Sequence, residues 1–269
     1  MRISHWTSLA RNAVRHPLAQ GHLHRTCGIC YILNSSIASA ALAPAAPNPR
    51  EGPPMDARQR RTRARLARTI LQLAAERPTS EISVSEIAAR AGINRSTFYQ
   101  HAAAPCELLE SVLAEELTEL SMTHLATVSA DDAPAAITRA TVAALRHIDE
   151  RADIYRVGLG DDLIGASLQP MLNRVFTSTV LDIFERGAIT LPHAECLSEE
   201  QRELFMRSAA HFVAAGSVAT FRVWLDTPAP RDVESFLGVI GELLPSWWPF
   251  ETEHGPALAP ADESALTRS

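Results

Sequence analysis

Cysteine is scarce and lysine is absent in this chain of 269 residues. The four cysteines, Cys27, Cys30, Cys106 and Cys196, are too few and too scattered for a disulfide framework, so a reducing cytoplasm is the expected compartment. Lysine is absent and all 25 basic side chains are arginine, which we attribute to a GC-rich genome. No apolar run reaches the roughly 18 residues that a spanning helix needs, so no membrane partner is expected.

The common motifs of enzyme chemistry are also missing. The sequence has no Gly-x-Ser-x-Gly, no Gly-x-Gly-x-x-Gly and no His-Glu-x-x-His. The acidic pairs at 131–132 and 161–162 are typical of loops and helix caps. His193 and Cys196 lack further ligands nearby. We therefore expect no catalytic residue, no cofactor and no metal site.

Charge is distributed unevenly along the chain. The net charge is -6, yet residues 56–105 carry nine arginines against four acids, whereas residues 106–269 carry eleven against 26. A polyanion is attracted by a local cluster of positive charge even where the whole chain is acidic. The pattern predicts a basic head that contacts nucleic acid and an acidic body.

Residues 1–54 differ from the rest and end in the Ala/Pro-rich run ALAPAAPNPREGPP. We expect a disordered leader or a mis-assigned start, with translation beginning at Met55. One alternative is a secretory signal, because Arg25 precedes a mildly apolar stretch, although polar residues interrupt that stretch. Another is a zinc or redox site at Cys27 and Cys30, for which no closing pair of ligands follows.

The basic head is predicted to contain three helices. Residues 56–76 are free of Gly and Pro and show helical periodicity. Ser83 and Glu86 fit a capping box that opens a second helix, and Gly92 ends it because glycine tolerates positive φ. Asn94 then caps a third helix, NRSTFYQH. This layout is typical of a helix-turn-helix that binds DNA.

Arginines crowd the start of the first helix, at Arg58, Arg60, Arg61, Arg63 and Arg65. A single arginine there would indicate a solvated surface. Five within eight residues, directly before a helix-turn-helix, favour a phosphate-seeking arm. From this arm we expect Arg58 and Arg61 to contact DNA.

The segment ISVSEIAARAGINRSTFYQH resembles the signature of the TetR/AcrR family: a helix with Ile-Ala-x-x-Ala-Gly, a turn, and a recognition helix ending in Phe-Tyr-x-His. The resemblance implies that an arginine at the start of the third helix reads guanine in the major groove, and that flanking side chains hold phosphates. The contacts that it implies are Ser83, Ser85, Asn94, Arg95, Ser96, Thr97, Tyr99 and His101. After His101 the chain has Ala-Ala-Ala-Pro-Cys where the family has a phosphate-binding lysine, so that contact is expected to be missing.

The body is predicted to be all-α. Helical segments are expected at 105–129, 133–151, 163–188, 198–226 and 231–245, and no strand alternation appears. The resemblance implies that the last two helices pair with their copies in a four-helix bundle across a two-fold axis. The dimer residues expected from it are Phe212, Gly216, Trp224, Phe236 and Ile240.

The same resemblance implies a ligand pocket among the middle helices of the body. The side chains expected to line it are Tyr155, Met171, Phe176, Val180 and Phe184, with His147 and His211 as polar candidates.

Together these features predict an all-α protein with an N-terminal three-helix helix-turn-helix domain at 55–104, a C-terminal helical bundle for ligand binding and dimerisation at 105–250, and a disordered tail at 251–269. The expected function is a transcription repressor that binds a palindromic operator in double-stranded DNA as a homodimer and is released by a small-molecule inducer. The alternatives are a helical interaction or ligand-binding homodimer that has lost operator binding, and a secreted helical binding protein.

Overall fold

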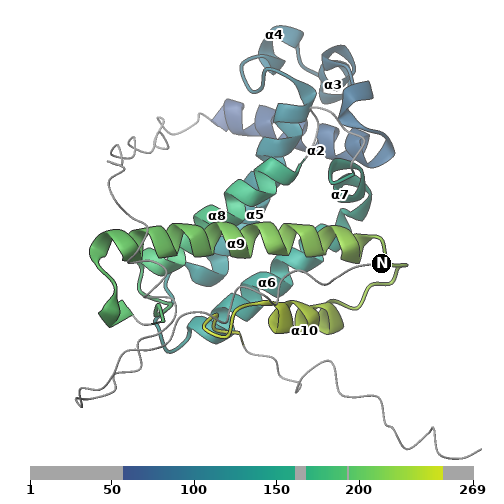
Figure 1. Cartoon of the computed structure of the whole chain (residues 1–269). Coiled ribbons are helices and arrows are strands. Elements are labelled where there is room, and N and C mark those ends of the chain that lie inside the picture. Colours follow the sequence, from purple (N-terminus) through teal and green to yellow (C-terminus); the bar gives the residue numbers. More distant parts are fainter. Residues whose placement is uncertain (1–56, 161–167, 193, 251–269) are drawn as a thin grey trace, which may run out of the picture. The chain divides into compact units, whose positions relative to one another are not determined.

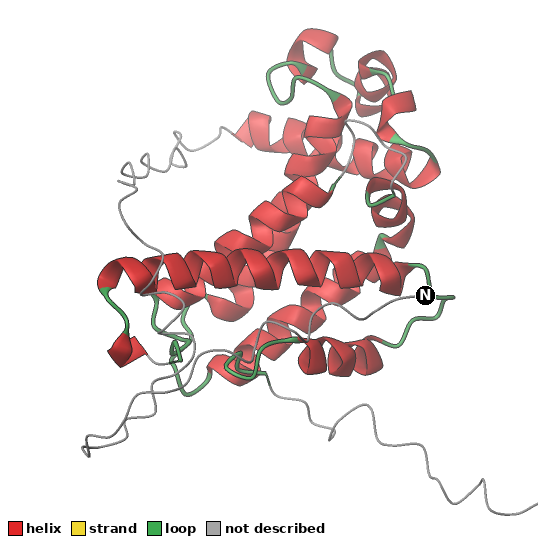
Figure 2. Cartoon of the chain, viewed as in Figure 1, coloured by secondary structure: helices red, strands yellow, loops and turns green. Residues whose placement is uncertain are grey.

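The structure is a computed structural model that describes residues 57–160, 168–192 and 194–250. Within these ranges every regular element is a helix, as Figure 2 shows, and the all-α prediction is confirmed. The same residues include no helix of the length and apolarity needed to cross a bilayer. The expectations for the 1–54 leader and its alternatives, the acidic pair at 161–162, His193 and the 251–269 tail lie outside the described residues.

The N-terminal part of the described chain holds three α-helices and one short 3-10 turn (Figure 1). Residues Leu66, Ile70 and Leu73 of the first helix, Ile87 of the second and Phe98 of the third are fully buried. They form the small core that fixes the angle between the helices. The elements are α2 (Ala57–Glu76), η1 (Thr79–Glu81), α3 (Val84–Ala91) and α4 (Arg95–Phe98).

The body comprises six further α-helices in the described residues (Figure 1). α5 packs against α6 and α8, and α8 packs along α9, the longest of them. The first helix, α2, packs on α5 and α7. The body elements are α5 (Pro105–Leu125), α6 (Ala133–Glu150), α7 (Ala152–Gly158), α8 (Gln169–Glu185), η2 (Ala194–Cys196), α9 (Glu199–Leu225) and α10 (Val233–Leu243).

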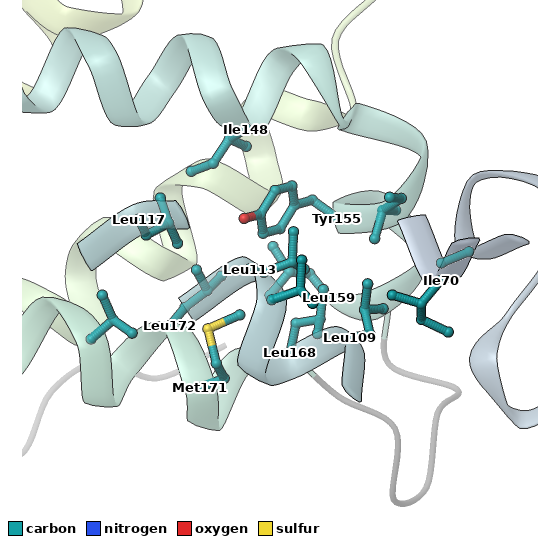
Figure 3. Close-up of a cluster of buried hydrophobic side chains, with 14 of the residues drawn as sticks. Ile70, Leu109, Leu113, Leu117, Ile148, Tyr155, Leu159, Leu168, Met171 and Leu172 are labelled. Atoms are coloured by element: carbon teal, nitrogen blue, oxygen red, sulfur yellow. The ribbon is translucent and has the colours of Figure 1, made fainter. Parts of the chain in front are cut away.

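One of these helices, α7, is missing from the sequence prediction. The chain leaves α6 at Arg151, where φ is -119° and ψ is 28°, and starts a new helix at Ala152 that continues through Gly158. The predicted helices at 133–151 and 163–188 leave residues 152–162 without regular structure, which is wrong for Ala152–Gly158. Tyr155 of α7 is fully buried between Leu113 and Ile148 (Figure 3), so packing rather than local preference holds this short helix.

Candidate nucleic-acid interface

The second helix, α3, begins with a one-sided cap. The Ser83 hydroxyl accepts a hydrogen bond from the Glu86 amide at 3.1 Å, as predicted. Glu86 does not return the bond, because its carboxylate pairs with Arg77 and, at 3.2 Å, with Arg90. The reciprocal capping box expected here is therefore wrong. The Glu86–Arg77 ion pair instead links α3 to the residue that follows α2. A complete capping box is present at Ser198, at the start of α9.

Gly92 makes the turn between α3 and α4. It adopts φ 63° and ψ 43°, the left-handed conformation that side chains with a Cβ disfavour. Its amide donates to the carbonyl of Ala89, and the Ile93 amide donates to that of Ala88 at 2.9 Å. These bonds satisfy the carbonyls of Ala88 and Ala89 at the end of α3, and the turn sets the direction in which α4 leaves.

The third helix is shorter than predicted, because regular α-helix covers only Arg95–Phe98 and tight turns continue to His101. Asn94 occupies the N-cap position without a side-chain bond to the helix. The side chain of Phe98 is completely buried and anchors the segment, whereas Tyr99 is 52% exposed. Arg95 and Ser96 are exposed, and Arg95 has no ion-pair partner within the described ranges.

A hollow of about 670 Å³ lies between α2 and the turn before α4; we call it the basic hollow. It brings together four of the predicted DNA contacts, Arg58 and Arg61 from α2 with Asn94 and Thr97 from the start of α4. Two further arginines of α2, at positions 65 and 68, line the same hollow. None of the four arginines has a carboxylate partner in the part of the chain that the structure describes. The site is thus a concentration of unneutralised positive charge.

Arg68 belongs to this site although the sequence analysis does not single it out. The signal was present, because positions 58, 61, 65 and 68 follow the three- and four-residue spacing of one helix face.

Arg63 is not part of the phosphate-seeking arm. Its side chain is only 14% exposed, it pairs with Glu115 of α5 at 2.5 Å, and it donates to the Ser111 hydroxyl at 2.8 Å. Its assignment to the phosphate-seeking arm is therefore wrong, because a tertiary contact with α5 neutralises its charge. Arg63 links the first helix to the body.

The other predicted phosphate contacts, at the start of α3 and after α4, differ in exposure and in charge. Burial and the positive charge of Arg63 lower the pKa of His101, so its ring is neutral near pH 7 and offers a hydrogen bond rather than a charge. At the start of α5, the Ala103 amide donates to Glu107 Oε2 at 2.7 Å. The chain's own carboxylate thus caps the helix where the family would place a cation. Ser83 and Ser85, at the start of α3, are exposed.

The residues predicted to bind a ligand are spread over several environments in the body. Phe176 and Val180 line a half-open pocket of about 90 Å³ between α5, α6, α8 and α9. Phe184 lies in the neighbouring apolar cluster, and His211 is exposed on α9.

Tyr155 and Met171 belong to a different part of the core, together with Leu113 and Leu172 (Figure 3). His147 Nε2 lies 3.0 Å from the Tyr155 hydroxyl, with Arg151 and Glu116 beside them. Burial, helped by the charge of Arg151, lowers the pKa of His147 to about 4, and burial raises the pKa of Tyr155. Both groups are neutral near pH 7.

The predicted dimer residues fall into two sets. Phe212 is 67% exposed and Gly216 is exposed, both on α9. Trp224, Phe236 and Ile240 are buried within the chain, and the Trp224 and Phe236 rings stack with centroids 4.8 Å apart. On the last two helices, further exposed apolar side chains that were not predicted are Leu204 and Val223 on α9 and Val239 and Leu243 on α10.

This geometry defines a helical protein of the helix-turn-helix DNA-binding class: a capped helix, a left-handed glycine turn, a short exposed helix and adjacent unpaired arginines. Residues 67–112 match the family described as bacterial regulatory proteins, tetR family. The match covers the helix-turn-helix segment and the start of α5, and it confirms there the resemblance predicted from the sequence.

Solved structures with a similar arrangement have low sequence identity to this chain. The dihydroxyacetone kinase operon activator DhaS is 18% identical, with a TM-score of 0.48 over 68% of this chain and 93% of its own. A TetR transcriptional regulator from Rhodococcus sp. RHA1 is 20% identical, with a TM-score of 0.46 over 69% and 96%. RolR in complex with resorcinol is 20% identical, with a TM-score of 0.43 over 70% and 89%. No curated protein sequence matches the chain.

Proposed function

We propose that the protein is a repressor that binds a palindromic operator in double-stranded DNA as a homodimer and is released by a small-molecule inducer. In this proposal residues 55–104 form the DNA-binding head, and residues 105–250 form the body that dimerises and binds the ligand. The observation that carries the proposal is the basic hollow, where four arginines without carboxylate partners lie beside the start of α4.

The proposed DNA contacts are of two kinds, contacts to base edges and contacts to backbone phosphates. Arg95 and Ser96 are exposed at the start of α4, where side chains can reach base edges, and an arginine can donate to guanine O6 and N7 together. The arginines of the basic hollow, with Tyr99, Ser83 and Ser85, are assigned to backbone phosphates. Because phosphate contacts position the protein without specifying sequence, the preferred operator depends chiefly on α4.

The dimer is assigned to the exposed apolar face of α9. Leu204, Phe212 and Val223 lie on this face, and the small exposed residues Ala215 and Ala219 between them allow another helix to approach closely. An apolar stripe of this length on one helix is typical of an interaction surface. Two copies joined here would present two recognition helices, which fits an inverted repeat whose half-sites lie about one helical turn apart.

Inducer release is assigned to a shift between conformations. The dimer would have two conformations that differ in the distance between its heads. A ligand that binds the body more tightly in one of them increases the population of that conformation. The bridge from Glu115 of α5 to Arg63 of α2 is a direct physical link from body to head. By linkage, operator DNA must weaken inducer binding by the same factor.

A helical homodimer that has lost operator binding is the second candidate. The observation that favours it is the start of α5, where Glu107 occupies the helix N-terminus that would otherwise face a phosphate. One missing phosphate contact weakens binding to all sequences alike, whereas the unpaired arginines of the basic hollow remain. We therefore favour the repressor.

Selection of DNA from a random pool by the full-length chain tests the proposal. We expect enrichment of an inverted repeat, and loss of the preferred bases in Arg95→Ala. Arg90→Ala is the matched control, because Arg90 of α3 is engaged by Glu86 and Glu76 and should leave the selected sequence unchanged. A folded, dimeric protein that enriches no sequence would contradict the repressor and support the second candidate.

A further inference from the structure

The lining of the basic hollow carries charge of one sign. One wall is the face of α2 that presents its four arginines, and the opposite wall is formed by the uncharged residues of the turn and the start of α4. None of the described residues that line the hollow is acidic. An anion placed there meets positive charge from one side and no negative charge from the other.

The carboxylates of the head are engaged elsewhere. Glu86 pairs with Arg77 and, at 3.2 Å, with Arg90. Glu76 pairs with Arg90 at 3.8 Å. Neither of these two arginines lines the hollow. The arginines of the hollow are thus left to an external partner, which must be an anion.

The donor groups of the hollow suit phosphate in particular. A guanidinium is planar and presents its N–H groups as a fork that matches two oxygens of one phosphate. Asn94 forms no side-chain hydrogen bond to α4, so its amide can donate to a ligand, and Thr97 lies on the same wall. Phosphate oxygens would therefore find donors on both walls of the hollow.

The four arginines line one common volume of about 670 Å³, which lies in the size range of small-molecule sites. A duplex spreads its phosphates along its length, with one charge per roughly 3.4 Å of each strand. A short chain of linked phosphates concentrates several charges in the same space. Because the arginines are exposed, each contact is screened by solvent, and tight binding requires several contacts together. The hollow thus favours a polyphosphate over a single phosphate.

We propose that the basic hollow binds a compact polyphosphate group, free or carried by a nucleotide, and that this anion competes with DNA. The inference rests on the proposed function, which assigns the same arginines to backbone phosphates, and it adds regulation at the head that needs no ligand in the body. An arginine that holds the polyphosphate is lost to the duplex. A rising polyphosphate concentration would therefore release the protein from its operator.

Isothermal titration calorimetry of the full-length protein tests binding. The probes are tripolyphosphate, orthophosphate and sulfate, all at one ionic strength and without added metal ions. We expect one tripolyphosphate per chain, bound at least tenfold more tightly than orthophosphate, because one further charge-assisted hydrogen bond accounts for about that factor. Adenosine triphosphate separates the two sources: an equal affinity places recognition in the phosphate chain, and a tighter one adds the nucleoside. Either result supports the proposed class, whereas tripolyphosphate that binds no more tightly than orthophosphate would overturn it.

The variant Arg65→Gln with Arg68→Gln locates the site. It should weaken tripolyphosphate binding at least tenfold, and it should fold because both positions are exposed and glutamine is a good helix former. The matched control is Arg139→Gln with Arg174→Gln, which removes the same charge from exposed positions of the body outside the hollow. Equal weakening in both double variants would show that binding follows net charge, and would overturn the assignment to the hollow.

Competition is measured by fluorescence anisotropy with a labelled duplex. Tripolyphosphate at ten times its own dissociation constant should raise the apparent dissociation constant of the duplex about tenfold by mass action, relative to sulfate at the same ionic strength. Unchanged affinity for the duplex would overturn the proposed competition. Tripolyphosphate bound at the hollow of a protein that selects no DNA sequence would support the anion site and contradict the repressor, so the two proposals fail separately.

Discussion

Arg61 and Arg63 lie two residues apart on α2 and have different surroundings. Arg61 is exposed and lines the basic hollow, whereas Arg63 is held by Glu115 and Ser111. Each phosphate that a cation neutralises releases counterions, so Arg61→Gln should reduce the steepness of log affinity against log salt by about 0.9. Arg63→Gln should leave that slope unchanged. Fluorescence anisotropy with a non-specific duplex at several salt concentrations measures both, and equal slope changes would contradict the assignment.

His147 should make stability depend on pH. Its pKa falls from 6.5 to about 4 on folding because it is buried, with Arg151 contributing and with Glu116 and Tyr155 facing it. Between these pH values His147 is protonated in the unfolded chain and neutral in the folded chain. The free energy of unfolding therefore decreases as pH falls from 6.5 toward 4. The full effect is about 3 kcal/mol, and above pH 6.5 it vanishes.

Urea unfolding of wild-type protein and His147→Gln between pH 4.5 and 7.5 isolates this contribution from the other titrating groups. The difference in unfolding free energy between the two proteins should shift in favour of the variant as pH falls. A difference that is constant across this range would show that His147 titrates normally in the folded state.

At the scale of single elements, the exposed face of α9 determines assembly in this account. Phe212→Glu should convert a dimer into monomers, because two carboxylates would then face each other in an apolar contact. Met122→Glu is the control, since Met122 is 50% exposed on α5, away from that face. Sedimentation velocity at micromolar concentration distinguishes the two; a Phe212→Glu protein that stays dimeric would place the interface elsewhere.

The helices of the head and most of the body were predictable from sequence because caps and periodicity are local signals. Gly92 and the hydroxyl of Ser83 end and begin helices as expected. α7 was not predictable, since seven residues next to a glycine-rich segment have too little periodicity, and its stability comes from burying Tyr155. Glu86 was mispredicted because Arg77, which directly follows α2, competes for its carboxylate.

The candidate sites were only partly predictable for the same reason. Arg95 and Arg61 are exposed where the sequence pattern places them, whereas nothing local shows that Arg63 turns toward Glu115. The pocket between α5, α6, α8 and α9 depends on the contact of four helices distant in sequence, so only part of its lining, Phe176 and Val180, was predicted. Trp224 and Phe236 resemble interface anchors in sequence, yet they stack on each other inside the chain.

At the scale of the whole molecule, three features support the proposed function: a short exposed helix beside the basic hollow, an apolar face on α9, and a pocket between α5, α6, α8 and α9. The function proposed from them is that of a dimer whose affinity for DNA depends on the distance between its two heads, and a ligand bound in the body would change that distance.

The measurement that tests this account most directly is affinity as a function of half-site spacing. Binding of the full-length protein to its selected inverted repeat is compared with binding to the same repeat carrying about five additional base pairs between the halves, which is half a helical turn. A rigidly joined dimer should lose most of its specific affinity, because the second recognition helix then faces the wrong side of the duplex. Equal affinity for both sites would show that each head binds alone and would contradict the proposed dimeric repressor.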